Sequence, residues 1–185
     1  DYSILPFPVE HRAQAAVGYA LIEEERRGVF NPDLARSLGI PEGPLWGRIA
    51  KGETVTLPDG RVIEPATLVG PTRSGRRVVV TGDTRPCAAT IEASANADLI
   101  VHEATFGDEE AQRAIETGHS TAREAAEVAA AAGARRLVLT HFSARFSRDP
   151  SEIEGQARER FPATSCARDG QEIDVPYAGT PSGQS

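Results

Sequence analysis

Ionisable side chains follow three short apolar stretches of this sequence. The stretches with these residues are Val80-Thr81-Gly82-Asp83, Val101-His102-Glu103 and Leu139-Thr140-His141. Buried strands of α/β proteins bind ligands at the edge where their carboxyl ends lie, so neighbouring strands would bring Asp83, His102-Glu103 and His141 to one rim. Imidazole and carboxylate are ligands that zinc, iron and manganese accept. A single histidine after a strand is also compatible with ordinary packing, so convergence is what favours a metal site.

His119 stands directly before a helix start signal. Thr121 and Glu124 form the Thr-x-x-Glu pattern of a capping box. The unpaired backbone N–H groups and the dipole of a helix start favour an anion. The pattern is therefore compatible with a phosphate beside His119, and equally with a plain helix start, and both interpretations stay open at this point.

Alternating strands and helices are expected to position these side chains. The runs at residues 77–80, 99–101 and 137–139 are apolar and rich in β-branched residues, as buried strands are. Residues 122–132 consist largely of alanine, the best helix former, and Gly133 supplies the stop. Further strands are expected at residues 1–5 and 17–22. The pattern predicts an α/β protein.

The stretch 28–52 differs in composition from the rest of the chain. Glycine and proline punctuate one short helical candidate at residues 33–38, which leaves few apolar side chains. We therefore expect an inserted arm without a core of its own. A turn signal, Pro58-Asp59-Gly60, lies between two β-rich runs and predicts a hairpin that closes the arm.

Composition limits the class of protein. A chain of 185 residues can bury one core. No apolar run reaches the roughly 20 residues of a membrane helix and no leader opens the sequence, so we expect a soluble, cytoplasmic protein. Cys87 and Cys166 belong to no CxxC pair, which argues against a thiolate zinc cluster or a disulfide framework.

Charge and the two ends of the chain add three expectations. The formal net charge of -7 argues against a broad nucleic-acid surface, although arginines cluster locally. The sequence contains no methionine, so its start is interpreted as a truncation. Residues 179–185 are small and polar and are expected to form a disordered tail.

Several sequence blocks resemble ribonuclease Z, a family of tRNA 3′-processing endoribonucleases. In the family's order they are Gly82-Asp83-Thr84, His102-Glu103-Ala104-Thr105, Gly118-His119-Ser120-Thr121 and Leu139-Thr140-His141-Phe142-Ser143-Ala144-Arg145. Upstream, Glu10-His11-Arg12 is similar to a histidine block of the family, and residues 39–45 resemble its protruding tRNA-binding arm. The resemblance spans residues 8–176.

This resemblance implies a metallo-β-lactamase fold, an αββα sandwich, of which residues 1–178 would form the C-terminal half with the inserted arm. It also implies a dinuclear zinc site. By motif, His11 would bind the first Zn²⁺, Asp83 would bridge both ions and His141 would bind the second. A carboxylate can offer one oxygen to each ion, whereas a neutral imidazole serves one. A metal pair about 3.5–4 Å apart would polarise the phosphodiester and activate a water.

The resemblance also implies roles for the remaining residues. His119 would donate a proton to the leaving 3′ oxygen, with Glu103 and His102 orienting it. Arg145 would clamp a phosphate, since guanidinium makes forked bonds to phosphate oxygens. Gly43-Pro44 of the arm would contact precursor tRNA, and the full-length protein would be a homodimer.

The sequence departs from the family in lacking the HxHxDH block of the N-terminal half. Its four histidines, at positions 11, 102, 119 and 141, cannot complete two tetrahedral zinc sites. Two alternatives to a complete endoribonuclease therefore stay open. One is a catalytically incomplete tRNA-binding fragment, which is favoured for the isolated chain. The other is a different metallo-β-lactamase-fold hydrolase acting on a small phosphodiester, which would not need the arm.

Overall fold

The computed structural model describes residues 1–12 and 14–178. The chain divides into two compact units. The first comprises Asp1–Glu23 and Arg76–Ser185, and the second comprises Glu24–Gly75. The predicted tail at residues 179–185 lies outside the described residues.

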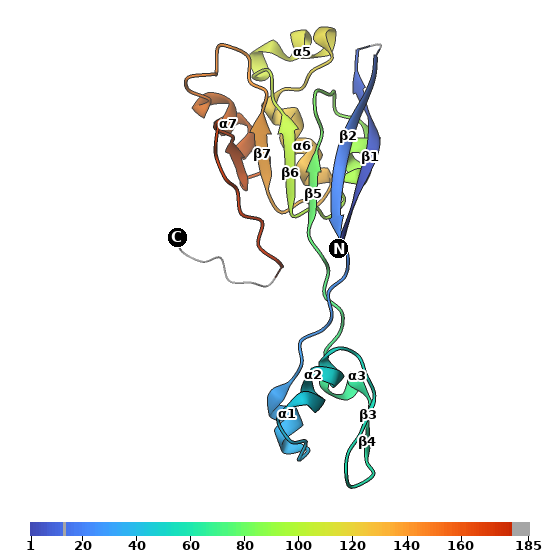
Figure 1. Ribbon diagram of the computed structural model, residues 1–185. Coiled ribbons are helices and arrows are strands. Elements are labelled where there is room, and N and C mark those ends of the chain that lie inside the picture. The colour runs from blue at the N-terminus through green and yellow to red at the C-terminus, as the bar shows by residue number, and fades with distance from the viewer. Residues whose placement is uncertain (13, 179–185) are drawn as a thin grey trace. The chain divides into compact units, whose positions relative to one another are not determined.

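The first unit is built on a six-stranded sheet (Figure 1). Its strands are β1 (Tyr2–His11), β2 (Gln14–Glu23), β5 (Arg77–Val80), β6 (Leu99–Glu103), β7 (Leu137–Thr140) and β8 (Thr164–Cys166), in the spatial order β1-β2-β5-β6-β7-β8. The pairs β1-β2 and β2-β5 are antiparallel, and β5 to β8 are parallel. The strands predicted from the three apolar runs are confirmed, and they are direct neighbours.

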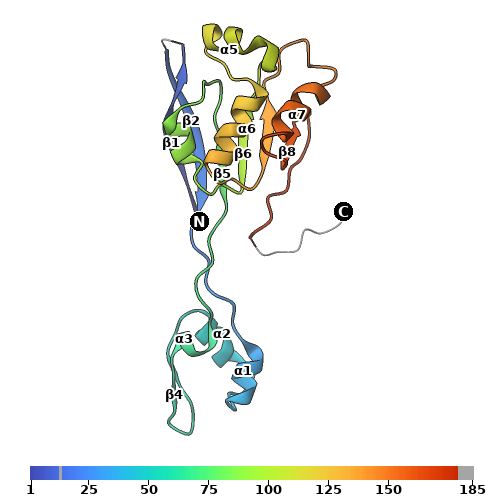
Figure 2. The ribbon, with the colours of Figure 1, turned by 180° about the vertical axis from the view of Figure 1, so that it is seen from behind.

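Helices cover one face of this sheet (Figure 2). They are α4 (Ala88–Ala93), α6 (Ala122–Ala131) and α7 (Ser151–Arg158). A 3₁₀ turn (Asp108–Glu110) and α5 (Ala111–Thr117) precede α6 and lie near the carboxyl ends of the parallel strands (Figure 1). No helix among the described residues is long and apolar enough to cross a membrane.

The capping box predicted for α6 is confirmed. The Thr121 hydroxyl accepts from the Glu124 backbone N–H, while the Glu124 carboxylate accepts from the Thr121 N–H. Gly133, with φ 63°, follows the helix where a left-handed residue is needed. Because α6 presents mainly alanine to the sheet, it packs closely on Ile100 and Leu139, both fully buried. Burying each such side chain stabilises the fold by about 1.5–3 kcal/mol.

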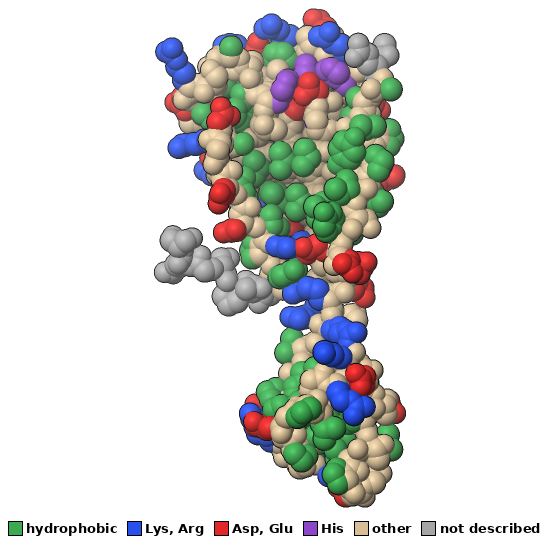
Figure 3. Space-filling model, in the orientation of Figure 1, with side chains coloured by type: hydrophobic (Ala, Val, Ile, Leu, Met, Phe, Trp, Pro, Cys, Tyr) green, Lys and Arg blue, Asp and Glu red, His purple; other side chains and the backbone are tan. Residues whose placement is uncertain are grey.

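The opposite face of the sheet is apolar and uncovered at β1, β2 and β5 (Figure 3). Its exposed side chains include Ile4, Val17, Tyr19 and Val80. They belong to the strand positions that alternate with the buried Val79 and Ala20. An exposed apolar area of this kind marks a surface that another element or chain covers.

The second unit consists of α1 (Pro32–Ser37), α2 (Pro44–Ala50), the hairpin of β3 (Val55–Thr56) and β4 (Val62–Ile63), and α3 (Pro65–Leu68). The hairpin is confirmed, and Gly60 at its turn has φ 85°. The expectation that this segment lacks a core is wrong. It buries its own cluster, Ala35, Ile40, Ile49, Val55, Leu57, Ile63 and Leu68. The unit is also longer than residues 28–52, and the hairpin and α3 supply the additional apolar side chains.

Candidate metal centre

Three histidines and an aspartate gather where the strands of the first unit end (Figure 3). His11 is the last residue of β1, Asp83 follows β5 and His141 follows β7. Two groups of side chains could each hold a metal ion, with all ligand atoms of a group within 4.8 Å of one another. One group is His11, Asp83 and His119, and the other is Glu103, His119 and His141.

These two groups adjoin each other. The His119 ring lies 4.8 Å from the His11 ring and 5.2 Å from the His141 ring, centroid to centroid. The His141 Nε2 atom lies 3.5 Å from an Asp83 carboxylate oxygen. The structure thus brings together His11, Asp83 and His141, although their roles as ligands stay predictions.

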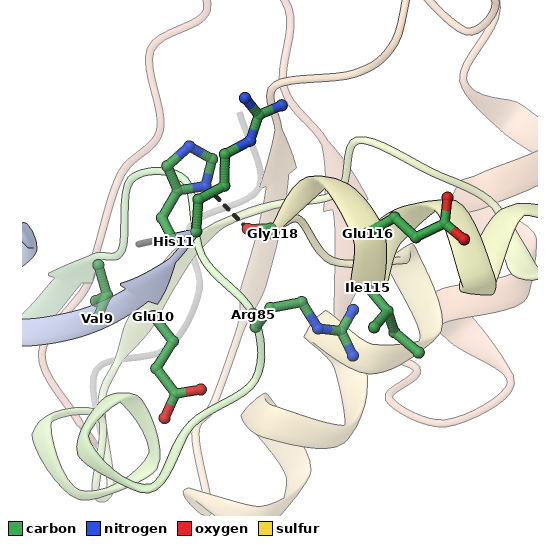
Figure 4. Close-up of a pocket in the computed structure, with 8 residues that line it drawn as sticks. Val9, Glu10, His11, Arg85, Ile115, Glu116 and Gly118 are labelled. Atoms are coloured by element: carbon green, nitrogen blue, oxygen red, sulfur yellow. Dashed lines mark hydrogen bonds between the residues drawn. The ribbon is translucent and has the colours of Figure 1, made fainter. Parts of the chain in front are cut away.

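The end of β1 is held against the loop before α6. His11 Nδ1 lies 2.9 Å from the carbonyl oxygen of Gly118 (Figure 4). A Cβ at Gly118 would lie 2.7 Å from the Arg12 backbone nitrogen, and Gly118 has φ 76°. Only glycine allows this approach. A cavity of about 890 Å³ opens beside it, with His11, Arg12 and Arg85 in its wall (Figure 4).

Glu103 is the hydrogen-bonding hub of the site. Its side chain is 1% exposed. One carboxylate oxygen accepts from the Thr84 N–H at 2.9 Å and from His119 Nδ1 at 2.8 Å. The other accepts from the N–H groups of Thr105 and Ser120, both at 3.1 Å, and from the Thr105 hydroxyl at 2.8 Å. Five donors compensate the cost of burying this carboxylate and hold the surrounding loops in place.

His141 is fixed by backbone conformation and by Thr105. It has φ 58°, a left-handed conformation that costs a non-glycine residue about 1–3 kcal/mol. Its Nδ1 atom lies 2.8 Å from the Thr105 hydroxyl oxygen. Because the single hydroxyl hydrogen of Thr105 is donated to Glu103, His141 Nδ1–H is the donor to Thr105. A chain of hydrogen bonds, called the relay below, therefore connects His141 through Thr105 to Glu103.

The hydrogen bonds of the three clustered histidines follow one pattern. Nδ1 of His11 donates to a carbonyl, Nδ1 of His119 to a carboxylate and Nδ1 of His141 to a hydroxyl. Each ring therefore keeps its Nε2 lone pair available, which is the state of a metal-binding imidazole whose second nitrogen is held by an oxygen. With the half-exposed Asp83 carboxylate, this donor set fits a divalent metal such as Zn²⁺.

His102 does not join the cluster, and the expectation that it shares the rim is wrong. Its side chain is fully buried in β6, where alternation directs it away from Glu103. Nδ1 donates to the Glu103 carbonyl at 2.7 Å, and Nε2 has no partner among the described residues. Burial lowers the pKa of His102, which favours the neutral form of the ring. An indirect effect on Glu103 stays a prediction.

The three predicted substrate-binding residues belong to neither of the two possible metal-binding groups. Arg145 bonds Glu109 at 2.5 Å and Glu110 at 3.1 Å, so a phosphate would have to compete with two carboxylates for its guanidinium. Gly43 and Pro44 begin α2 in the second unit. Gly43 has φ 139°, and a Cβ there would meet nothing within 4 Å, so this turn is open to solvent.

Sequence patterns did not single out Thr105 or Arg85. Thr105 was visible only as the last residue of a motif. Arg85 forms an ion pair with Glu124 and donates to the His119 carbonyl at 2.7 Å. It thereby ties the start of α6 to the loop after β5. No spacing rule indicates such a pairing, because its partners are 34 and 39 residues away.

Comparison with known proteins gives the class of the fold. Residues 56–142 match the Beta-lactamase superfamily domain. The solved structure of human tRNase Z, short form, matches 95% of this chain with 23% sequence identity and a TM-score of 0.54. The match covers 44% of the human chain. The metallo-beta-lactamase fold protein YhfI from Bacillus subtilis covers 92% at 20% identity and a TM-score of 0.55, with 48% of its own chain covered. The chain has the metallo-β-lactamase fold.

Curated relatives define the family more closely. A protein named ribonuclease Z from Gemmatimonas aurantiaca is 65% identical over 95% of this chain, and one from Myxococcus xanthus is 54% identical over 95%. A protein named ribonuclease Z from Haloferax volcanii is 52% identical over 99% of this chain. Over almost its whole length the chain is thus similar to proteins named ribonuclease Z. It spans about half the length of the curated relatives it matches, 56% of the first and 58% of the third.

Proposed function

We propose that this chain carries part of the active site of a zinc-dependent endoribonuclease that removes the 3′ trailer from precursor tRNA. The products would be a 3′-hydroxyl on the tRNA and a 5′-phosphate on the trailer. The observation that carries the proposal is the gathering of His11, Asp83, His119 and His141 around the Glu103 hub, in a chain 65% identical to a ribonuclease Z.

His11, Asp83 and His141 would hold the metal. A bound divalent cation supplies polarisation of the phosphodiester and stabilises the charge that develops during cleavage. The chain's own part is orientation. Oxygen partners on each Nδ1 direct Nε2 of His11 and His141 toward the site. The half-exposed Asp83 can offer both carboxylate oxygens.

His119 would act as the general acid. Its side chain is only 13% exposed, and Nδ1 donates to Glu103. The Glu103 carboxylate can therefore balance the charge of a doubly protonated ring, which leaves a proton on Nε2 for the leaving 3′ oxygen. Such a proton transfer contributes about 10²–10⁴-fold to a rate. His119 also belongs to both possible metal-binding groups, so its role needs a test that separates acid from ligand.

A chimera tests the proposal directly. In it, this chain replaces the matched 175 residues of the Gemmatimonas aurantiaca relative. We expect Zn²⁺-dependent cleavage of a precursor tRNA at the trailer junction, and loss of both bound zinc and cleavage with Asp83→Asn. A chimera that folds and binds zinc but leaves precursor tRNA intact would refute the proposal. Arg160→Gln, on an exposed arginine that lines neither the site nor its cavities, is the control.

A catalytically incomplete RNA-binding protein is the second candidate for the 185-residue chain in isolation. The observation that favours it is the small number of possible metal ligands among the described residues. These are three histidines and two carboxylates, and one of the carboxylates is buried and fully hydrogen-bonded. Two tetrahedral zinc ions need more ligands than this. We expect the isolated chain to bind zinc weakly and to cleave no precursor tRNA. Tight binding of two zinc equivalents with robust cleavage would exclude this candidate.

The expectations about binding partners stay predictions. The second unit, which carries Gly43 and Pro44, would dock the tRNA, and the full-length protein would be a cytoplasmic homodimer. A small-molecule phosphodiesterase of the same fold is a weaker candidate because it would not need the 52-residue segment 24–75.

A further inference from the structure

A second cavity of the first unit has His141 in its wall. Its volume is about 870 Å³, within the range of small-ligand sites. The loop that follows β7 and the turn that follows β8 form its walls, so it opens at the same edge of the sheet as the candidate metal centre. His141 lines it together with Phe142, Arg148, Arg168 and Asp169.

The two arginines of this cavity differ from the other cationic side chains of the first unit. Among the described residues of that unit, every other arginine side chain makes a hydrogen bond or an ion pair. Arg148 and Arg168 are exposed and make neither, although Asp149 and Asp169 stand beside them in the sequence and in the cavity wall. The chain has an excess of acidic residues and a formal net charge of -7. Two guanidinium groups without an acidic partner among the described residues, beside the candidate metal centre, are therefore unexpected.

The cavity also offers an acceptor and an aromatic surface. Asp149 is already engaged, because its carboxylate accepts from the Ser151 N–H at 3.0 Å. Asp169 is exposed and makes no side-chain hydrogen bond or ion pair with the described residues, so it can accept from a hydroxyl or an amino group. Phe142 is half-buried in the cavity wall, where an aromatic face can stack on a base.

We propose that this cavity is a binding subsite for a single-stranded ribonucleotide that adjoins the bond being cleaved. Arg148 and Arg168 would bind its phosphates, since guanidinium groups fork to phosphate oxygens. Asp169 would accept from a 2′-hydroxyl, which DNA and a bare phosphate lack. The inference rests on the proposed endoribonuclease function, because that function puts a scissile RNA phosphate beside His141.

Binding without cleavage tests the subsite. The chain is titrated in EDTA into a fluorescently labelled six-nucleotide RNA, and anisotropy is followed at several KCl concentrations. For Arg148→Gln/Arg168→Gln we expect Kd to rise at least about tenfold. The slope of log K against log[salt] should fall by about 1.4, about 0.7 for each lost contact to a single strand. The thermal midpoint should not change, since neither guanidinium has a partner in the fold.

Three comparisons make the result specific. Arg160→Gln removes one exposed charge elsewhere and should leave Kd within about twofold, and Arg148→Lys/Arg168→Lys should fall between wild type and the glutamine variant. Asp169→Ala, which removes the acceptor, should reduce the preference for RNA over DNA of the same sequence. Absence of measurable RNA binding by the wild-type chain, equal binding of RNA and DNA, or an unchanged Kd in the double glutamine variant would each overturn the subsite.

Cleavage by the chimera separates this inference from the proposed function. If RNA binding depends on Arg148 and Arg168 but the chimera cleaves no precursor tRNA, the proposed activity fails while the subsite stands. If the chimera cleaves with wild-type kcat/KM after both arginines are replaced, the activity stands and the subsite is wrong.

Discussion

Thr105 provides a sharp test of the relay between the buried carboxylate and the candidate metal centre. Its hydroxyl lies 2.8 Å from both the Glu103 carboxylate and His141 Nδ1. Thr105→Val keeps the size and branching of the side chain but removes the hydroxyl. The His141 ring then loses the partner that orients Nε2, whereas Glu103 keeps four of its five donors.

Two different magnitudes follow from this geometry. Loss of the oxygen partner of a metal-binding histidine weakens metal affinity about 10–100-fold, which corresponds to roughly 1.4–2.7 kcal/mol. Loss of one hydrogen bond to a charged group costs the fold roughly 1.5–3 kcal/mol, and the four remaining donors to Glu103 limit this cost. We therefore expect a clear loss of zinc affinity in a protein that still folds.

Zinc affinity is measured by competition with a chromophoric chelator, and folding by urea denaturation of the metal-free chain. Thr105→Ser, which keeps the hydroxyl, should restore most of the affinity. Thr164→Val is the matched control, since its buried hydroxyl donates to the Phe161 carbonyl away from the site. If zinc affinity is unchanged in Thr105→Val, or falls equally in Thr164→Val, the relay does not orient His141.

Three further outcomes are expected. In the chimera, His119→Ala should keep the zinc content and lower kcat. A substrate whose leaving group has a low pKa should recover most of the lost rate. Equal loss on both substrates, or loss of zinc, would make His119 a ligand or a structural residue. Replacing Glu24–Gly75 of the chimera by a short Gly-Ser link should raise KM for precursor tRNA far more than for a small phosphodiester, whereas equal losses would exclude a docking role. Hydrogen bonds from Arg76 lower the pKa of Glu23 from 4.5 to about 2, so the carboxylate stabilises the fold above pH 4.5 and loses this effect as the pH falls toward 2. The stability advantage of wild type over Glu23→Gln in acid denaturation should vanish over that interval, and an advantage independent of pH would contradict this assignment.

Local patterns were sufficient for the parallel part of the sheet and for α6. Apolar β-branched runs predicted β5, β6 and β7, and the capping box with its alanine-rich stretch predicted a helix that the structure confirms within one residue. Several short elements were not predicted, among them α4 and β8. Elements of six and three residues are too short for periodicity to separate them from loops.

The second unit shows where composition misled. Its glycine and proline content suggested an arm without a core, because that inference counted apolar residues only up to position 52. Leu57, Ile63 and Leu68 come from beyond that limit and close a separate core over Ile49. Contacts between residues far apart in the sequence decided this point, and no local pattern reports them.

The sequence by itself determined which residues could carry the chemistry. The positions of Asp83, Glu103, His119 and His141 relative to predicted strands and a capping box were enough to indicate a metal-dependent site, since strand ends of a parallel sheet share one edge. His102 shows the limit of that argument, because adjacent residues of a strand face opposite sides and only the tertiary packing says which of the two sides carries the site.

Only the tertiary structure decided how those residues are held. The Nδ1 partners of His11 and His141 lie 107 and 36 residues away, and the left-handed backbone at His141 is set by the loops around it. Hydrogen-bond geometry, tautomers and the unpaired state of Arg148 and Arg168 depend on three-dimensional distances between loops. Those distances are established only when the sheet, α6 and α7 pack together, so they cannot be inferred from spacing along the chain.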